Sequence, residues 1–481
     1  MRGIAKAGFF AGLICFVTIL MLPPPKGMSA PAHHMAATVV LMALWWITEA
    51  IPIPVTALLP VILFPILGIM PSSKATLPYA NHLIFLFLGG FFIAIAMEKW
   101  DLHRRVALRT MLLIGTRPRR LVLGMMIGTA LLSMGISNTA TTMVMIPIAL
   151  SILRQLVPTF TSIEELETTS PHTAHLAVNL VLGIAYAASI GGIATLIGTP
   201  PNALLAGMVE QLLNSELPFF QWLLIGFPLS VVMLFGTWWL MTRVLFPIGQ
   251  IELAGGRKLL KKELRKLGAF SRPEKVVAGV GLLVGLGWIF RGLLHPKYVH
   301  DATIAMLGAI ALFFFPSGDF ERPYVLEWED AARIPWGIVL LFGGGFALAK
   351  GMVTTGLDRF LVQQLNSFAH LPASLLTGGV ILLAIFLTEI TSNTATASLL
   401  LPLMAALGRA ANIPPLILMT GACLATSFAF MLPVATPPNA IAFGSGYIGM
   451  NHMVRAGFWL NLLGTLLIWA TAYIWLPFVW K

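Results

Sequence analysis

The sequence predicts an all-α membrane protein that crosses the bilayer many times and is built from two repeats of opposite orientation. Three observations predict this fold: the composition is too apolar for a water-soluble core, basic residues gather in two connections, and two polar motifs recur at a fixed spacing. Of the 481 residues, 58% are hydrophobic and 10% are charged, and the mean hydropathy is +0.88. So much apolar surface requires lipid as part of its solvent.

The apolar stretches have the length of membrane spans. A bilayer core of about 30 Å is crossed by about 20 apolar residues in a helix. The first stretch, 8–24, runs into three consecutive prolines without a small-residue cleavage site, which favours a retained span over a secretory signal. Further spans are predicted along the chain near 34–49, 53–70, 82–100, 219–245, 276–294, 302–316, 336–350 and 456–480.

The net charge of +11 is concentrated in two connections between spans. Basic residues beside spans mark the cytoplasmic side, so both connections are placed in the cytoplasm. A cytoplasmic N-terminus agrees with this, because four spans then return the chain to the inside at the first cluster. The distribution indicates a secondary contact with membrane lipid and argues against nucleic acid as a partner. The clusters comprise Arg104, Arg105, Arg109, Arg117, Arg119 and Arg120, and then Arg257, Lys258, Lys261, Lys262, Arg265, Lys266, Arg272 and Lys275.

Between the first cluster and the span 219–245 the chain must cross an odd number of times, because that span starts outside and enters the cytoplasm at the second cluster. The region offers three apolar pieces, and the first two, 121–134 and 140–155, are too short to span comfortably. They predict a hairpin that enters the membrane and returns, with its tip at 135–139. The longer third piece, 176–213, makes the single crossing.

The second half of the chain repeats the first at a constant spacing. Ser137 and Ser392 lie at an offset of 255, and four further pairs share this offset. Thr-Pro-Pro-Asn-Ala recurs at an offset of 237, because the second copy shortens the linker near 156–174. The second hairpin then enters from the opposite side, which is the inverted-repeat plan of secondary transporters. The further pairs are Gly89 and Gly344, Leu102 and Leu357, Arg104 and Arg359, and Pro147 and Pro402.

These features divide the chain into an N-terminal span with an external loop, a first repeat, a basic cytoplasmic linker and a second repeat. Each repeat is predicted to contain one re-entrant hairpin followed by one broken helix. The four divisions are 1–33, 34–246, 247–275 and 276–481, the hairpins lie near 121–155 and 376–407, and the broken helices lie near 176–213 and 414–446.

Ser-Asn-Thr stands at 137–139 and again at 392–394, within apolar hairpins. Non-helical backbone in hydrocarbon persists only where protein or a polar cavity satisfies it. Amide, hydroxyl and carbonyl oxygens supply the hard ligands of an alkali cation, and the N-terminus of the returning helix offers N–H groups to an anion. The prolines of the downstream motif break the facing helix and expose further carbonyls. One such motif alone is more often a turn or an interhelical contact, but the repeated pair predicts a central anion and sodium site.

Two carboxylates in or beside apolar stretches, Glu49 and Glu389, are further candidates. Glu389 lies three residues before Ser392, but its counterpart one repeat earlier is Met134, so ion coupling and a structural salt bridge or hydrogen bond both stay open. No histidines stand at metal-ligand spacing within a span, so a zinc site is not expected. A nucleophile with a base is also missing at membrane depth, so we do not expect an enzyme.

On these motifs the sequence resembles the divalent anion/sodium symporter family, over essentially its whole length. The matching elements are Ile-Thr-Glu-Ala-Ile-Pro-Ile-Pro at 47–54, both Ser-Asn-Thr-Ala-Thr runs and both Thr-Pro-Pro-Asn-Ala breaks. The resemblance implies a homodimer with eleven spans and two re-entrant hairpins in each protomer. It also implies an elevator mechanism, in which a transport domain moves against a scaffold. We expect the protein in the plasma (inner) membrane of a prokaryote.

The resemblance also implies which residues form the site. Neither motif contains Lys, Arg or His, which favours sodium symport over exchange. The first sodium site would comprise Ser133, Ser137, Asn138 and the backbone at Gly198, and the second Thr388, Thr391, Asn393 and Ala435. The substrate would contact Ser137, Asn138, Thr139, Ser392, Asn393 and Thr394, with Thr199, Pro200, Thr436 and Pro437 beside them.

The sequence therefore predicts sodium-coupled import of C4-dicarboxylates such as succinate, malate and fumarate, with Na⁺ as the coupling ion and no organic cofactor. Exchange of dicarboxylates or citrate and symport of sulfate stay open, because hydroxyls and backbone amides accept any compact anion. A channel is disfavoured, because inverted repeats with broken helices are typical of alternating access.

Overall fold

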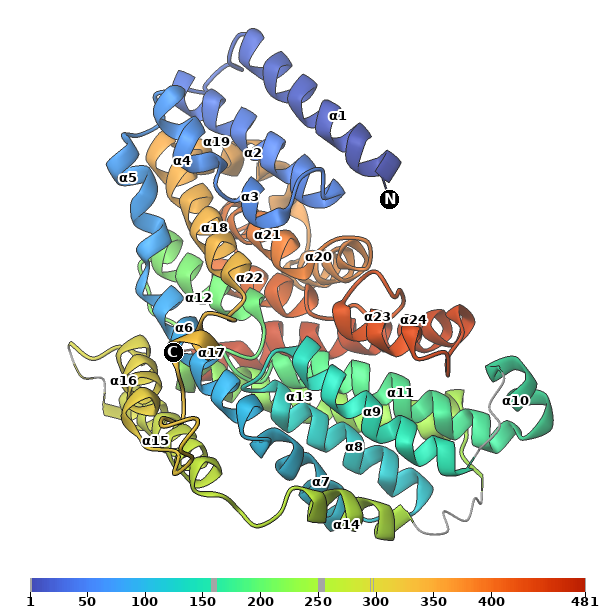
Figure 1. The fold of residues 1–481 in the computed structure, drawn as a ribbon. Helices are drawn as coiled ribbons and strands as arrows, with labels where there is room; N and C mark the ends of the chain where they lie inside the picture. The colour runs from blue at the N-terminus through green and yellow to red at the C-terminus, as the bar shows by residue number, and fades with distance from the viewer. Residues whose placement is uncertain (1, 157–161, 250–255, 295, 297, 481) are drawn as a thin grey trace.

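The computed structural model describes residues 2–156, 162–249, 256–294, 296 and 298–480. These residues form helices joined by loops (Figure 1), with an isolated β-bridge between Pro316 and Tyr324. The all-α prediction is confirmed for this part of the chain. The predicted linkers at 156–174 and 247–275 fall in part on 157–161 and 250–255, which lie outside the described residues.

Within the described ranges, eight helices are long and apolar enough to cross a membrane, and three shorter apolar helices accompany them. The short helices would complete the eleven spans that the resemblance implies. The long segments are Gly3–Met21, Ala30–Thr48, Ser72–Lys99, Pro171–Gly192, Phe219–Leu245, Arg272–Leu294, Trp336–Thr355 and Met450–Val479, and the short ones are Ile53–Ile66, Asp301–Phe314 and Pro415–Ala425.

The span predicted near 53–70 corresponds to the short apolar helix Ile53–Ile66, which is interrupted. The chain there forms two short helices, α3 (Ile53–Thr56) and α4 (Leu59–Ile66). Pro60 lies in the first turn of α4 and Pro65 lies inside it, so the amide donors of a continuous helix are missing at both positions. The next short elements, α5 (Ser72–Thr76) and a 3₁₀ turn (Leu77–Ala80), lead into the long helix α6.

The two repeats form helices with matching ends. α8 (Pro118–Ser133) and α20 (Ala373–Thr388) begin and end at the same offset that relates the two Ser-Asn-Thr motifs. The helices that return from each hairpin tip, α9 and α21, also begin at this offset, and α12 and α23 begin at the offset of the two Thr-Pro-Pro-Asn motifs. The other bounds are α9 (Asn138–Leu156), α21 (Asn393–Ala410), α12 (Pro200–Leu213), α23 (Pro437–Gly444), α6 (His82–Lys99), α18 (Trp336–Thr355), α7 (Leu102–Ile114), α19 (Leu357–Leu365), α11 (Pro171–Gly192) and α22 (Pro415–Ala425).

The repeats interlock at their polar segments. α12 of the first repeat packs against α21 and α22 of the second, and α23 of the second packs against α9 and α11 of the first. α11 lies at the centre of this unit, since 94% of the residues in its most apolar stretch are buried. Each hairpin tip is thereby held beside a helix break.

The other helices surround this unit. α1 and α2 form a packed pair, α13 packs against α11 and α24, and α16 packs against α15 and α6. Their bounds, with those of the short connecting elements, are α1 (Arg2–Met21), α2 (Ala30–Thr48), α10 (Ile163–Thr169), α13 (Phe219–Trp239), a π-helical turn (Leu240–Leu245), α14 (Gly256–Lys266), α15 (Arg272–Leu294), α16 (Asp301–Phe314), α17 (Trp328–Ala331), a 3₁₀ turn (Asn366–His370), α24 (Met450–Ala470), a second π-helical turn (Thr471–Trp475) and α25 (Leu476–Val479).

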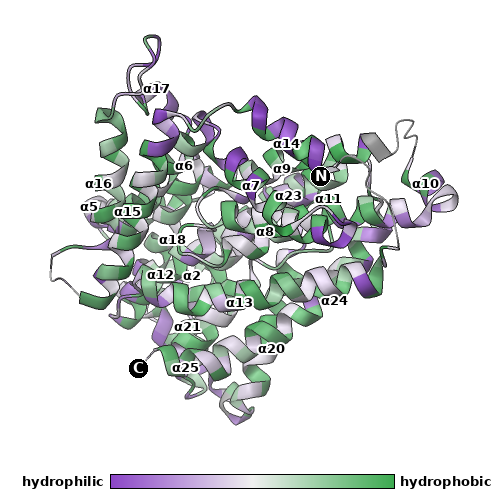
Figure 2. Ribbon diagram, turned by 90° about the horizontal axis from the view of Figure 1, so that it is seen from below, coloured by the Kyte–Doolittle hydropathy of each residue, from purple (hydrophilic) through white to green (hydrophobic). Residues whose placement is uncertain are grey.

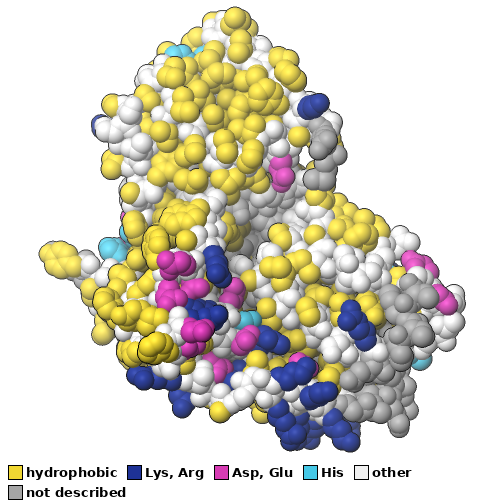
Figure 3. Space-filling view, viewed as in Figure 1, with side chains coloured by type: hydrophobic (Ala, Val, Ile, Leu, Met, Phe, Trp, Pro, Cys, Tyr) yellow, Lys and Arg dark blue, Asp and Glu magenta, His cyan; other side chains and the backbone are white. Residues whose placement is uncertain are grey.

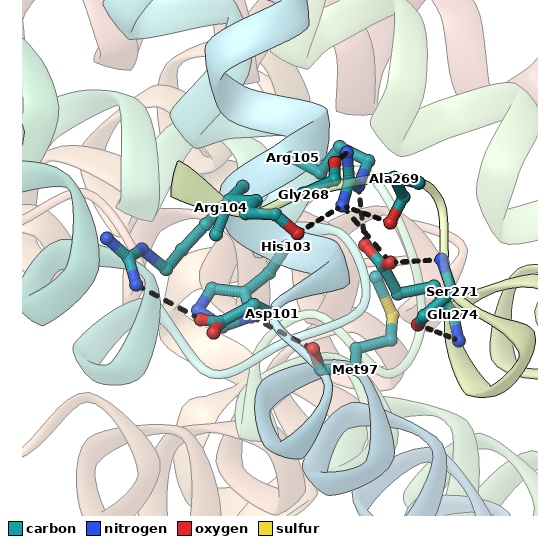
Figure 4. A network of polar contacts seen from close by, with 10 residues as sticks. Met97, Asp101, His103, Arg104, Arg105, Gly268, Ala269, Ser271 and Glu274 are labelled. Atoms are coloured by element: carbon teal, nitrogen blue, oxygen red, sulfur yellow. Dashed lines mark hydrogen bonds and ion pairs between the residues drawn. The ribbon is translucent and has the colours of Figure 1, made fainter. Parts of the chain in front are cut away.

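One arginine of the first basic cluster is buried in an ion pair with the second basic connection. Arg105 of α7 donates through its guanidinium to both carboxylate oxygens of Glu274 in α15, at 2.5 and 3.2 Å (Figure 4). The same guanidinium donates to the carbonyls of Leu267, Gly268 and Ala269 in the turn after α14. Both charged side chains are only 4% exposed, so Arg105 joins the two connections and is not available to lipid headgroups.

Apolar side chains cover much of the outer surface. Figure 2 shows hydrophobic residues along the long helices and hydrophilic residues concentrated in α14 and α17. In Figure 3 the Lys and Arg side chains gather along the lower edge, where α7 and α14 lie in Figure 1. The large apolar side chains exposed on the helices include Phe10, Leu113, Leu283, Leu307 and Phe478. Such a surface is expected where helices face lipid.

Candidate functional site

A cavity of about 610 Å³ lies where the two hairpin tips meet the two helix breaks. Gly198, Thr391 and Ala435 of the predicted sodium sites line it, whereas Ser133 and Thr388 lie behind its wall with 0% exposure. All ten residues predicted to contact substrate line this one cavity, namely Ser137, Asn138, Thr139, Thr199, Pro200, Ser392, Asn393, Thr394, Thr436 and Pro437.

The first half-site is built around the hydroxyl of Ser133, the last residue of α8. Its Oγ lies 2.5 Å from Oδ1 of Asn138 and 2.7 Å from the carbonyl oxygen of Ala188 in α11. The carbonyl of Gly198 is close by, because a Cβ built on Gly192 would lie 2.7 Å from Asn138 Oδ1 and 3.1 Å from the Gly198 oxygen. Oxygens from the hairpin, from α11 and from the first break therefore converge.

The second half-site repeats this arrangement. Thr388 is the last residue of α20, and its Oγ1 lies 2.7 Å from Oδ1 of Asn393 and 3.0 Å from the carbonyl oxygen of Thr426. As in the first half-site, the hydroxyl and amide oxygens come from the hairpin, and the backbone carbonyl comes from the segment before the break, here from Thr426 directly after α22.

Both half-sites contain more oxygen acceptors than protons. The single proton of the Ser or Thr hydroxyl can serve the amide oxygen or the backbone carbonyl, but not both at once. Neutral hydroxyl, amide and carbonyl oxygens are also the hard ligands that an alkali cation takes. The residues present in each half-site therefore fit Na⁺.

Two other predicted sodium ligands have hydroxyls that are engaged elsewhere. Ser137 Oγ accepts the backbone N–H of Ala140 at 3.2 Å, in the first turn of α9. Thr391 Oγ1 lies 2.7 Å from the carbonyl oxygen of Leu387 and 2.6 Å from the hydroxyl of Thr396. Both hydroxyls therefore already have hydrogen-bond partners within their own hairpin.

The N-termini of four helices meet the cavity. The first residues of α9, α12, α21 and α23 all line its wall. The positive end of the helix dipole at all four positions suits a carboxylate or another oxyanion. Free N–H groups are offered only by α9 and α21, because α12 and α23 each begin with two prolines, which have no N–H to donate. Among the described residues that line the cavity there is no Lys, Arg or His. An anion there would be held by dipoles, hydroxyls and neighbouring cations.

The asparagines of the two Thr-Pro-Pro-Asn motifs hold the helix breaks in shape, a role that the sequence did not reveal. Asn202 Nδ2 donates to the carbonyl of Thr195 at 2.7 Å, and Asn439 Nδ2 donates to the carbonyl of Leu432 at 3.0 Å. Thr195 and Leu432 are related by the same offset as the two asparagines. The recurrence of asparagine at this offset was the available signal, but its partners lie in the unwound segments.

Glu389 has a dense set of hydrogen-bond donors in the second break. Its carboxylate accepts the backbone N–H groups of Phe430, Met431 and Leu432 at 2.7, 2.9 and 3.1 Å. It also accepts the side-chain amide of Asn461 in α24 at 2.7 Å, and the residue is 3% exposed. The carboxylate therefore fixes the unwound segment against the hairpin tip and α24.

The first repeat holds the equivalent segment without a carboxylate. Met134 stands at the position of Glu389, and its carbonyl accepts the hydroxyl of Thr195 at 2.5 Å. Thr195 Oγ1 in turn accepts the N–H of Gly198 at 3.0 Å. In the second break Leu432 stands where Thr195 stands in the first. The polar side chain that holds the second break is therefore Glu389, which comes from the hairpin tip and not from the break. This exchange favours the hydrogen-bonding role for Glu389 that the sequence left open.

Gly192→Ala is expected to weaken sodium binding at the first half-site. The added Cβ would lie 2.7 Å from Asn138 Oδ1, closer than real Cβ contacts allow, so the amide must move. Overpacking of this kind costs about 1–3 kcal/mol, which corresponds to about a tenfold higher sodium concentration for half-maximal thermal stabilisation of the purified protein. Gly444→Ala is the matched control, because a Cβ there meets nothing within 4 Å. Unchanged sodium dependence in Gly192→Ala would show that Asn138 is not held as described.

The chain is similar to named bacterial transporters along nearly its whole length. It is 42% identical over 476 residues to the sodium-dependent dicarboxylate transporter SdcS of Staphylococcus saprophyticus, covering 98% of this chain and 91% of the relative. The protein of the same name from Staphylococcus aureus is 41% identical over 478 residues, with coverage of 98% and 91%.

Two solved structures share the fold at low identity. Neisseria gonorrhoeae MtrF, presented with a class of antimetabolite efflux pumps, aligns with a TM-score of 0.58 at 12% identity, over 96% of this chain and 97% of MtrF. The Alcanivorax borkumensis YdaH transporter aligns with a TM-score of 0.56 at 14% identity, over 84% of this chain and 86% of YdaH. At these identities the likeness concerns the fold alone.

The family described as the sodium:sulfate symporter transmembrane region matches residues 5–480. This match extends over both hairpins, both breaks and the helices around them. The chain therefore belongs to the sodium:sulfate symporter family, the divalent anion/sodium symporters that its motifs resemble.

Proposed function

We propose that the protein is a secondary active transporter that imports C4-dicarboxylates, such as succinate, malate and fumarate, by symport with sodium. One observation carries this proposal: in each repeat a Ser or Thr hydroxyl, an Asn amide oxygen and a backbone carbonyl converge at the cavity wall. The name of the two Staphylococcus relatives, sodium-dependent dicarboxylate transporter, supports the same ion and substrate class.

The charges of the proposed ligands balance one another. Two Na⁺ ions and one dianion carry no net charge together, which lowers the cost of holding each away from bulk water. Neutral oxygens would bind the cations, and the four helix N-termini would face the carboxylates. The first cation would be bound by Ser133, Ser137, Asn138 and Gly198 and the second by Thr388, Thr391, Asn393 and Ala435, with the dianion between them.

The arrangement supports transport without a covalent step. Glu49 is the one ionisable side chain among the described residues that line the cavity, so general acid–base chemistry would have no second partner there. Dicarboxylate or citrate exchange and sulfate symport are the alternatives within the family, because N–H groups and hydroxyls accept other compact anions as well.

The packing supports an elevator-type motion. The hairpins and broken helices interlock through α12, α21 and α22 on one side and through α9, α11 and α23 on the other, so they would move as one unit. The scaffold would comprise α2 to α6 and α15 to α18, in each protomer of a homodimer. The basic clusters would keep the N-terminus and α14 on the cytoplasmic side of a prokaryotic plasma membrane.

Proteoliposomes provide the test. The purified protein should accumulate labelled succinate when an inward sodium gradient is imposed, and accumulation should stop when potassium replaces sodium. Unlabelled malate and fumarate should compete strongly, and sulfate and citrate weakly. Uptake that ignores the sodium gradient would exclude symport, and uptake that depends on dicarboxylate inside the vesicles would identify an exchanger.

A further inference from the structure

Glu49 is a carboxylate in a cavity that we propose to hold a dianion. It lines the cavity together with both Ser-Asn-Thr tips, and the other described residues of the lining carry no ionisable group. The residue is exposed, and its side chain makes no hydrogen bond or ion pair with the described residues. The cavity therefore contains one uncompensated negative charge. It is contributed by the end of α2, outside the helices that build the half-sites.

The backbone at Glu49 is in an unusual conformation for a residue with a side chain. It follows the last turn of α2 with φ 47° and ψ 42°, in the left-handed region, and its N–H bonds back to the carbonyl of Trp45. Glycine or asparagine is the common residue at such a helix end, because a Cβ is disfavoured there. A conformational penalty held at the edge of a ligand cavity points to a role for the side chain in function.

We infer that Glu49 makes dianion binding depend on sodium by keeping the empty cavity electronegative. This inference rests on the proposed function and adds a residue outside the two half-sites. A cleft lined by one sign of charge concentrates the opposite ion and opposes its own sign. Sodium would therefore enter first, and the dianion would bind well only after the cations have offset the carboxylate. Glu49 would act through space, without touching the substrate.

The size of the effect follows from the valence of the ligand. For unit charges about 10 Å apart in a water-filled cleft, the Coulomb term changes a dissociation constant about twofold to fourfold. A dianion experiences twice the energy of a monoanion, so its factor is the square of the monoanion factor. The ratio of these two factors distinguishes a charge that acts through space from a direct contact. Loss of a direct contact would change the dissociation constant according to the shape of the ligand and not according to its charge.

The experiment compares succinate with monomethyl succinate in calorimetric binding to the purified protein. The E49Q variant keeps the size of the side chain and removes the charge. Without sodium we expect E49Q to bind succinate about fourfold to sixteenfold more tightly than the unchanged protein, and monomethyl succinate about twofold to fourfold more tightly. The sodium concentration for half-maximal stabilisation should rise about twofold to fourfold. Raising the ionic strength with choline chloride should reduce all three changes.

Three variants serve as controls. E49D keeps the charge and should behave like the unchanged protein, whereas E164Q removes an exposed carboxylate of α10 and should change nothing. Glu49→Gly also relieves the left-handed backbone, so it should match E49Q in binding and melt at a higher temperature.

Equal effects of E49Q on the dianion and the monoanion, or no effect on either, would overturn the role of Glu49. Sodium-driven uptake by the unchanged protein would in that case still stand, so this result is distinct from failure of the proposed function. The absence of a sodium-driven succinate flux in the unchanged protein would instead remove the proposed function itself.

Discussion

Asn138→Ala and Asn393→Ala are each expected to reduce sodium-driven succinate uptake about a hundredfold. Each substitution removes the amide oxygen that lies 2.5 Å from the Ser133 hydroxyl or 2.7 Å from the Thr388 hydroxyl. Losing one such oxygen from a desolvated cation costs up to about 3 kcal/mol, which is about a hundredfold in binding. The measurement is the initial rate of labelled succinate uptake into proteoliposomes at fixed sodium.

The control for these two variants is Asn451→Ala, which removes an exposed amide in the first turn of α24, outside the cavity. It should leave uptake unchanged. The uptake rate of the double variant should be only slightly lower than that of the less active single variant, because both half-sites serve one transport step. Normal uptake by either single variant would show that its half-site does not bind a coupling ion.

Glu389→Ala is expected to lower the melting temperature strongly and to weaken sodium binding at the second half-site. It leaves three backbone N–H groups and the Asn461 amide without their acceptor, in a place that is 3% exposed. Each unsatisfied buried donor costs about 1–3 kcal/mol, so the total is several kcal/mol. Thermal unfolding of the purified protein, recorded at increasing sodium, measures both effects.

Glu389→Gln should fall between Glu389→Ala and the unchanged protein, because it keeps one acceptor oxygen and replaces the other with a donor. The matched control is Met134→Leu at the same position of the first repeat, where the backbone carbonyl, and not the side chain, makes the hydrogen bond. That variant should shift the melting temperature little. If Glu389→Ala melted normally but lost sodium coupling, the carboxylate would be a cation ligand and not a clamp on the second break.

The repeat was predictable because matching residues recur in the sequence at a constant offset. Ser137 and Ser392 fixed the hairpin tips, and the structure places the helix ends Ser133 and Thr388 at the same offset as these two serines. Proline placed the starts of α12 and α23, since it ends the preceding helical pattern and is favoured in a first turn. Motif spacing and proline positions are local features of the sequence, and they can be interpreted without knowledge of the tertiary structure.

The contacts that the sequence did not reveal are those between distant segments. The carboxylate of Glu389 accepts hydrogen bonds from residues 430–432 and from α24. Arg105 pairs with Glu274, which lies in a distant part of the chain. Neither pairing has a spacing that a motif could show.

The interruption of the span near 53–70 was missed for a different reason, because apolar composition outweighed Pro60, in the first turn of α4, and Pro65, inside it. Hydropathy reports burial in lipid or protein, and it does not report whether the helix is continuous.

The most direct test of two sodium half-sites around one anion is to count both ions in the same transport event. Proteoliposomes loaded without sodium would receive labelled sodium and labelled succinate together, with the membrane potential clamped. Two half-sites predict that at least two sodium ions enter for each succinate, and that Asn138→Ala and Asn393→Ala each reduce both fluxes together, by about a hundredfold. A ratio of one sodium ion or none per succinate would contradict the paired site.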